Sequence, residues 1–186
     1  MKKIILLSLT IGLFTIQSCS DKNAQTDIQA QTQTSLAGQV YGWTNPPLDT
    51  TKCEQVLQSN NSFPKLLFID DSTFIKAFPA SCGDLGTCTR YYIGKYKIDD
   101  QALLLTFNPK MVVYHMKSKN LLSPYVELEN SDFSKERLVR RDCKNILFFE
   151  ECDTQGSLMT PKADTLANDI KFLKSKNILD KLFEIK

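Results

Sequence analysis

The stretch Arg90–Phe107 (RYYIGKYKIDDQALLLTF) decides the fold class of this chain of 186 residues. Its two ends, Arg90–Ile98 and Ala102–Phe107, are rich in the aromatic and branched residues that favour strands. Between them lies the short polar connection Asp99–Gln101. Two such runs on either side of a short turn are typical of a β-hairpin, so we expect two neighbouring antiparallel strands here.

Further short strands are expected on both sides of this hairpin. Turn residues such as Asp70–Ser72 separate them at short intervals, which favours an antiparallel barrel or sandwich over alternating strands and helices. We predict a mainly β fold, a single antiparallel meander barrel. The other segments predicted as strands are Leu36–Trp43, Lys65–Ile69, Thr73–Phe78, Met111–Met116, Tyr125–Leu128, Leu138–Val139 and Ile146–Phe149.

The C-terminal end has a helical pattern instead. Thr160–Pro161 suits an N-cap followed by the first helical position. Leu166, Ile170 and Leu173 recur at helical spacing, and Asn177 is a plausible left-handed stop. We therefore expect a C-terminal α-helix packed on the barrel wall, followed at Ile178–Ile185 by a second short helix or a closing strand.

The N-terminal end has the three-part layout of an export signal. Lys2 and Lys3 precede the uncharged apolar run Ile4–Ile16, which is shorter than the roughly 20 residues of a membrane-spanning helix. Cys19 then follows a small residue, and this junction resembles the lipobox of bacterial lipoproteins. The resemblance implies cleavage before Cys19 and attachment of acyl chains such as palmitate to that residue, which would hold the protein on a membrane.

Cleavage there divides the chain into three parts. Residues 1–18 are the predicted signal, residues 19–35 the lipidated cysteine with a polar, flexible tether, and residues 36–186 one barrel domain with its C-terminal helix. Of the 23 Lys and Arg, the two in the signal would be removed, leaving 21 against 21 Asp and Glu. A domain without basic excess does not favour a nucleic-acid partner.

Five cysteines remain after the lipidated one, and an exported protein lies where disulfides form. Because five is odd, at least one thiol is free or pairs with another chain. With one left over, about fifteen pairing patterns are possible, and the sequence does not choose among them. Short loops favour Cys82 with Cys88 and Cys143 with Cys152, which would leave Cys53 over.

The middle of the chain resembles the small lipocalin-like barrels of bacterial lipoproteins, such as the copper-stress lipoproteins of the NlpE group. The matching positions are Gly94, Tyr96, Leu103, Leu105 and Phe107. The resemblance implies a lipocalin-like barrel. This chain lacks the Cys-x-x-Cys of the NlpE group and has no Gly-x-Trp in its first strand, so it takes no ligand or metal assignment from either family. The signal, the Ser-Cys-Ser junction and the Gln/Thr-rich tether resemble lipoproteins of the Bacteroidota.

No motif for catalysis or for phosphate binding is present in the sequence, so we expect neither an enzyme nor a cofactor. His115 is the single histidine, and in a strand we expect it to be a packed side chain. Cys82 and Cys88, with Met111, Met116 or His115, would suit a soft ion such as Cu(I). A disulfide is favoured for that cysteine pair, so no metal is predicted.

The basic segment Lys135–Lys144 could meet anionic lipid headgroups or an acidic partner, but a solvated strand face is preferred.

These observations together predict a lipid-anchored protein of the cell envelope, most simply of the outer membrane. They do not distinguish the periplasmic face of that membrane from its surface face. Its expected role is to hold a small apolar ligand without catalysis, since a barrel of about eight strands can enclose one. The alternatives are an accessory module with a packed barrel that contacts an envelope protein, or a copper-stress lipoprotein. The residues expected to line the barrel interior are Phe68, Phe74, Tyr92, Tyr96 and Phe107.

Overall fold

The computed structural model describes residues 35–44, 64–120, 122–143, 146–151, 158–161 and 166–185, and most of these lie in one antiparallel sheet. The strands are β1 (Val40–Thr44), β2 (Lys65–Phe68), β3 (Thr73–Ser81), β4 (Thr87–Ile98), β5 (Ala102–His115), β6 (Tyr125–Asn130), β7 (Lys135–Cys143), β8 (Ile146–Glu151) and β9 (Leu158–Pro161). The helices are the 3₁₀ turn η1 (Gly83–Leu85), α2 (Leu166–Ser175) and α3 (Ile178–Glu184).

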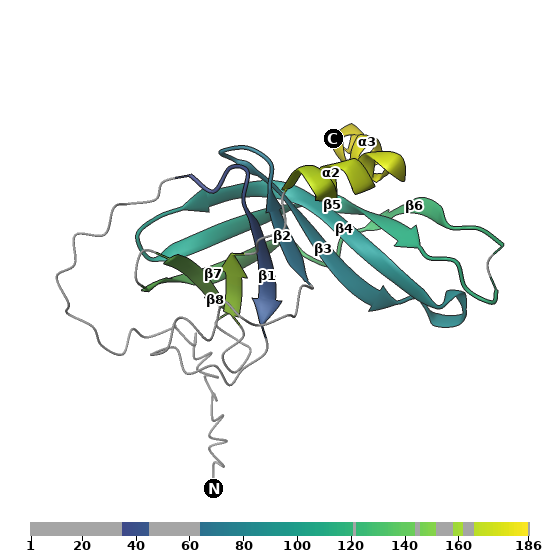
Figure 1. Cartoon of the computed structure of the whole chain (residues 1–186), viewed down its shortest axis with the longest axis horizontal. Coiled ribbons are helices and arrows are strands. Elements are labelled where there is room, and N and C mark those ends of the chain that lie inside the picture. The colour runs from purple at the N-terminus through teal and green to yellow at the C-terminus, as the bar shows by residue number, and fades with distance from the viewer. Residues whose placement is uncertain are drawn as a thin grey trace, which may run out of the picture.

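Eight of the strands pair in an unbroken circuit, in the order β1, β2, β3, β4, β5, β7, β8, β9 and back to β1. Neighbouring strands are antiparallel throughout. The prediction of a mainly β, antiparallel barrel with a helical C-terminus is therefore confirmed. Figure 1 shows the strands curling around one another, with the two helices lying on the outside.

Strand β5 belongs to the barrel and to an extension beyond it. Ala102–Thr106 pairs with β7, whereas Lys110–His115 pairs with β6. The sequence predicted two strands here, which is wrong, because β5 runs straight through Pro109. The far ends of β3, β4 and β5, together with β6, project from the barrel on the right of Figure 1.

Pro109 is tolerated because β5 changes partners beside it. Gly94 of β4 pairs with Phe107 and Tyr92 with Met111, so the two strands slip out of register between these pairs. A proline, which has no amide hydrogen, is accommodated at such a bulge. The Pro109 carbonyl still accepts a hydrogen bond from the Ser131 amide at 2.9 Å.

Gly94 is required by close packing at the same bulge. A Cβ at this position would lie 2.2 Å from the carbonyl oxygen of Thr106 and 2.8 Å from the ring of Phe74. Only glycine, which has no Cβ, permits β4 and β5 to approach in this way.

The barrel is closed by β9, a strand that the sequence did not indicate. Tyr41 pairs with Pro161 and Trp43 with Met159, while Phe149 of β8 pairs with Met159 from the other side. Thr160 and Pro161 therefore end a strand. Their prediction as the start of the C-terminal helix is wrong, because α2 begins at Leu166.

The side chains of the sheet form two buried layers. Phe74 and Leu103 belong to the inner layer, which fills the barrel. Ile75 and Tyr91 belong to the outer layer, which packs against Leu173 and the other buried side chains of the helices. Alternation along the strands thus places one set inside and the other beneath α2 and α3.

The two helices meet at Asn177, which adopts the left-handed conformation with φ 56° and ψ 26°. This confirms the predicted stop, and Ile178–Glu184 forms the second short helix. Ile178 and Leu182 are fully buried against the outer layer. Among the described helices, none has the length and apolar character needed to cross a bilayer.

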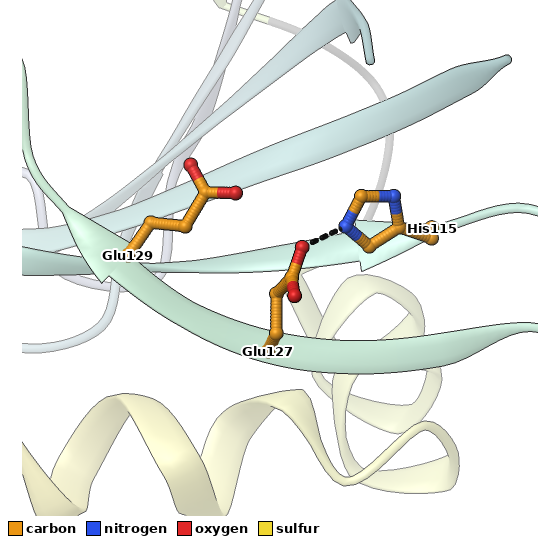
Figure 2. Close-up of side chains that lie close together, drawn as sticks. All are labelled: His115, Glu127 and Glu129. Atoms are coloured by element: carbon orange, nitrogen blue, oxygen red, sulfur yellow. Dashed lines mark hydrogen bonds and ion pairs between the residues drawn. The ribbon is translucent and has the colours of Figure 1, made fainter. Parts of the chain in front are cut away.

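At the far end of the extension, β5 and β6 place polar side chains on the face opposite the helices. Met111 pairs with Glu129, Val113 with Glu127 and His115 with Tyr125. Since alternate residues share a face, His115, Glu127 and Glu129 lie on one side of the strand pair. Figure 2 shows His115 and Glu127 pointing toward one another, with Glu129 on the same strand as Glu127.

Candidate functional site

The five residues predicted to line the barrel interior all lie in the inner layer and are buried. They pack mainly on one another. The ring centroids of Phe68 and Tyr96 are 4.9 Å apart, and those of Phe74 and Phe107 are 5.0 Å apart. Tyr92 lies 5.9 Å from Phe107. Their placement matches the expectation, while their role in ligand binding stays a prediction.

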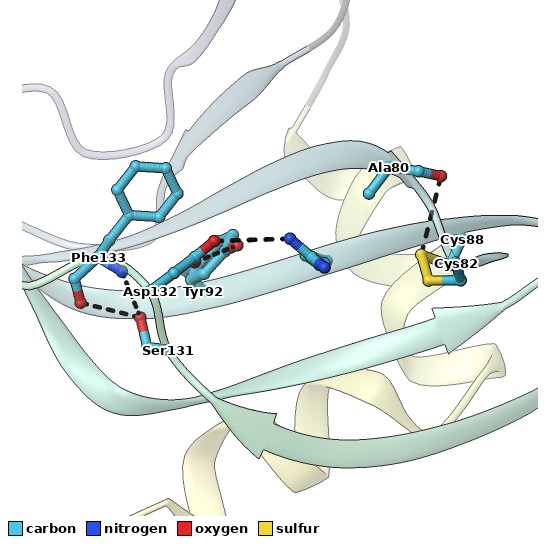
Figure 3. Close-up of polar contacts among 8 residues, drawn as sticks. Ala80, Cys82, Cys88, Tyr92, Ser131, Asp132 and Phe133 are labelled. Carbon is cyan, nitrogen blue, oxygen red and sulfur yellow. Dashed lines mark hydrogen bonds and ion pairs between the residues drawn. A yellow bond between two sulfur atoms is a disulfide. The ribbon is translucent and has the colours of Figure 1, made fainter.

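One end of this aromatic group is covered by the connection between β6 and β7. Phe133 lies 5.0 Å from the Tyr92 ring and 5.3 Å from the Phe107 ring. The hydroxyl of Tyr92 donates a hydrogen bond of 2.8 Å to Asp132, as Figure 3 shows. Burial, and then the neighbouring Asp132, raise the pKa of Tyr92. The connection therefore packs over the inner layer and restricts access to it from this side.

A buried ion pair stands beside Phe133. The ammonium of Lys76 is 2.7 Å from the Glu136 carboxylate, and its side chain is 3% exposed. The same ammonium lies 4.6 Å from the ring centroid of Phe133, within cation–π range. The inner layer thus contains a charged pair, beside which the binding of a purely apolar ligand would be unfavourable.

A pocket of about 560 Å³ lies on the outer layer, beneath α2, and its size is in the range that accommodates a small organic molecule. The strands β2, β3, β4 and β5 form its floor, and α2 forms its wall. Its apolar lining consists mainly of Leu67, Ala77, Tyr91, Tyr114, Phe172 and Leu173. We call this the α2 pocket.

The α2 pocket contains one unusual polar group. Lys65 of β2 and Asp169 of α2 form an ion pair of 3.4 Å through Asp169 Oδ1. The second carboxylate oxygen, Oδ2, is buried and has no hydrogen-bond partner. Burial raises the pKa of Tyr91 to about 12, so its phenol stays neutral at physiological pH. A buried acceptor without a donor is costly to the folded chain.

The charged side chains of the basic segment Lys135–Lys144 are divided between the two sides of β7, with Glu136 and Arg140 turned inward. Lys135 and Arg137 are exposed on the outer side, and Lys95 and Lys97 of β4 lie on the other side of β5. Together they line a shallow hollow of about 730 Å³ on the surface.

The structure brings His115 together with two glutamates that the sequence analysis did not single out. We call His115, Glu127 and Glu129 the His115 cluster; their ligand atoms all lie within 4.8 Å of one another. His115 is 2% exposed, its Nε2 contacts Glu127, and its ring stacks on Tyr125 at 4.4 Å. Its other nitrogen, Nδ1, is buried without a hydrogen-bond partner. The alternation of Glu127 and Glu129 on one strand was the available signal.

The predicted disulfide between Cys82 and Cys88 is present, with the Cα atoms 5.9 Å apart. It joins the end of β3 to the start of β4, as Figure 3 shows. In this form the two sulfurs are not thiolates, so they offer no soft-metal site. Cys19, Cys53, Cys152 and the side chain of Cys143 lie outside the described residues, as do the predicted signal and all of the predicted tether except Ser35.

Among the described residues, the α2 pocket and the His115 cluster both offer groups to a ligand. They lie on opposite faces of β5, because Tyr114 and His115 are adjacent in a strand. The chain was compared with protein-family models, with curated proteins and with solved structures, and nothing matches in any of the three.

Proposed function

We propose that this protein is a lipid-anchored component of the bacterial cell envelope that binds a small apolar ligand without catalysis. The proposed location in the envelope rests on the sequence, where the charged start, the apolar run and Cys19 follow one another as in exported lipoproteins. The observation that carries the binding role is the α2 pocket, a mainly apolar hollow of about 560 Å³ beneath α2.

The α2 pocket suits a ligand better than the aromatic group inside the barrel. The centroids of the inner rings are 4.9 to 5.9 Å apart. Phe133 and the Lys76–Glu136 pair lie against these rings. Space for a ligand among these residues would require the rings to separate, which loses packing on every side. The α2 pocket needs no such rearrangement.

The pocket lining indicates the chemistry of the ligand. Leu67, Tyr114 and Phe172 supply apolar surface for a compact hydrocarbon or aromatic body. The ion pair of Lys65 and Asp169 adds one polar group to this lining, so a ligand with one polar group beside its apolar body would fit.

Two aromatic residues on the helices provide a matched test. Phe172 lines the pocket and is 42% exposed, while Phe183 is 53% exposed and outside it. The probe is N-phenyl-1-naphthylamine, an apolar fluorophore with one N–H donor. We expect Phe172→Ala to weaken binding roughly tenfold, corresponding to the loss of about 1.4 kcal/mol of apolar contact. Phe183→Ala should bind as the unaltered chain does.

Three outcomes would count against the proposal. Equal binding by Phe172→Ala and the unaltered chain would place the probe elsewhere. Loss of binding in Phe74→Leu, with Phe172→Ala unaffected, would place it inside the barrel. Native mass spectrometry of the chain extracted from membranes tests the lipid anchor. Acyl chains on Cys19 add their mass to the chain, and this added mass should be missing in Cys19→Ala. An unacylated mature chain would contradict the lipid anchor.

A further inference from the structure

We propose that His115, Glu127 and Glu129 bind one Zn²⁺ ion. This site is separate from the α2 pocket and does not depend on the ligand proposed for it. The sequence predicted no metal, because a disulfide was favoured for Cys82 and Cys88. The pairing of β5 with β6 supplies a different set: one imidazole nitrogen and two carboxylates.

The strand register produces this set. His115 pairs with Tyr125, so Glu127 is its diagonal neighbour on the same face, and Glu129 follows two residues further along β6. Diagonal neighbours on a sheet are within reach of long side chains. Glutamate is long enough to bring both carboxylates toward the imidazole, and the three ligand atoms lie within 4.8 Å of one another. Figure 2 shows this convergence.

The ring of His115 is fixed in place by its packing. Its ring is buried and stacks on Tyr125 at an interplanar angle of 14°, so Nε2 faces Glu127 in a fixed direction. Glu127 and Glu129, in contrast, are partly exposed. A rigid imidazole and two adjustable carboxylates can close around an ion, whose tetrahedral ligands are separated by about 3.4 Å.

The charges around the cluster favour a cation. Arg90 of β4, which pairs with Val113 of β5, forms its ion pair with Asp132 at 3.5 Å. Within the described residues, His115 is the one basic group that pairs with Glu127, and no ion pair neutralises Glu129. Two carboxylates on one strand face therefore carry negative charge that a divalent ion would balance.

The ligand types favour a divalent transition-metal ion, of which we propose zinc. Mg²⁺ and Ca²⁺ prefer sets made of oxygen alone, whereas Cu(I) prefers sulfur. One imidazole with two carboxylates suits Zn²⁺, which is bound through nitrogen and oxygen at about 2.0 to 2.2 Å. Three protein ligands leave a fourth tetrahedral position for water. Because β6 lies at the end of the strand order, the ion would fasten an edge strand to β5.

Zinc binding is tested with the full chain, purified in detergent, stripped with a chelator and with its free thiols alkylated so that they cannot bind metal. Equilibrium dialysis against Zn²⁺ at about 10 μM, followed by elemental analysis, should give one ion per chain. Competition with a chromophoric chelator gives the affinity. Loss of one ligand should weaken binding by at least about tenfold, so Glu127→Gln and Glu129→Gln should both do so.

The matched control is Glu184→Gln, which removes an exposed carboxylate from α3, far along the chain from the cluster. It should bind zinc as the unaltered chain does. Zn²⁺ should also raise the melting temperature of the unaltered chain and leave that of Glu127→Gln unchanged. Both glutamates are partly exposed, so their replacement by glutamine should preserve the fold, and circular dichroism checks this. His115→Gln should also lose zinc.

The proposal is overturned by a folded, unaltered chain that binds no stoichiometric zinc. It is equally overturned when zinc is bound but Glu127→Gln and Glu129→Gln retain the affinity of Glu184→Gln, because the ion would then lie at another site. Neither result bears on the α2 pocket, whose probe and variants are different.

Discussion

Replacing Gly94 by alanine tests the packing at the bulge where β5 leaves the barrel. The new Cβ would lie 2.2 Å from the Thr106 carbonyl oxygen, whereas ordinary contacts begin at 3.4 Å. The two strands would have to separate locally by about 1.2 Å, at a position where β4 pairs with β5 on one side and β3 on the other. Overpacking of this kind costs up to about 3 kcal/mol.

Part of that cost is offset, because alanine loses less backbone entropy than glycine on folding, by roughly 0.5–1 kcal/mol. We therefore expect Gly94→Ala to lower the free energy of unfolding by about 2 kcal/mol. For a domain of this size, the melting temperature should fall by roughly 4–8 °C. Urea unfolding followed by circular dichroism measures the first quantity, and calorimetry the second.

The carbonyl of Thr106 and the ring of Phe74 both meet the new Cβ, and a double-mutant cycle separates them. Phe74→Leu removes the ring contact but leaves the backbone carbonyl in place. We expect it to restore little of the stability lost in Gly94→Ala. Equal stability of Gly94→Ala and the unaltered chain would refute the reasoning. Full rescue by Phe74→Leu would show that the ring, and not the strand approach, excludes a side chain here.

Two further predictions concern charged groups. Glu136→Gln leaves the buried ammonium of Lys76 without its charged partner and should lower the free energy of urea unfolding by about 2–3 kcal/mol. Adding Lys76→Met should recover most of that stability. Unchanged stability of Glu136→Gln would contradict this. The amides of Gln101 and then Ala102 donate to Asp99 and hold the pKa of its carboxyl below its usual value. Its stabilising contribution is thus present above about pH 4 and lost as pH falls through the lower, folded-state pKa, so Asp99→Ala should flatten the decline of the urea midpoint there. Parallel declines in both chains would exclude this role.

The sequence predicted the strands well where local pattern and tertiary contact agree. Arg90–Ile98 and Ala102–Phe107 form the expected hairpin within β4 and β5. The sequence predicted two strands in place of β5 because proline normally interrupts a strand. At Pro109 the strand changes partners, so no amide hydrogen is needed there. No local pattern reveals that change, since it depends on where β6 and β7 attach.

The strand β9 was missed for a related reason. Leu158–Pro161 is four residues long and ends in Thr160–Pro161, which locally resembles the beginning of a helix. Its extended conformation is set by pairing with β1, which lies far earlier in the chain, and with β8, the strand that precedes it. Tertiary pairing overrode the local preference.

The candidate sites were less predictable than the fold. The aromatic residues predicted for the interior do lie there, because alternation along a strand fixes which side chains share a face. The α2 pocket depends on how a helix lies across the outer layer, which the helical spacing of Leu166, Ile170 and Leu173 does not determine. The His115 cluster depends on the register of β5 and β6, which is set by the chain between them.

The pairing of β1 with β9 has a consequence for the order of folding. Tyr41 and Pro161 are 120 positions apart, so the barrel closes only after nearly the whole chain has been made. Contacts of such long sequence separation form late and slowly, since the loop between them must be closed first. A chain of this design stays open during synthesis. Such late closure would be compatible with the export that we propose for this protein.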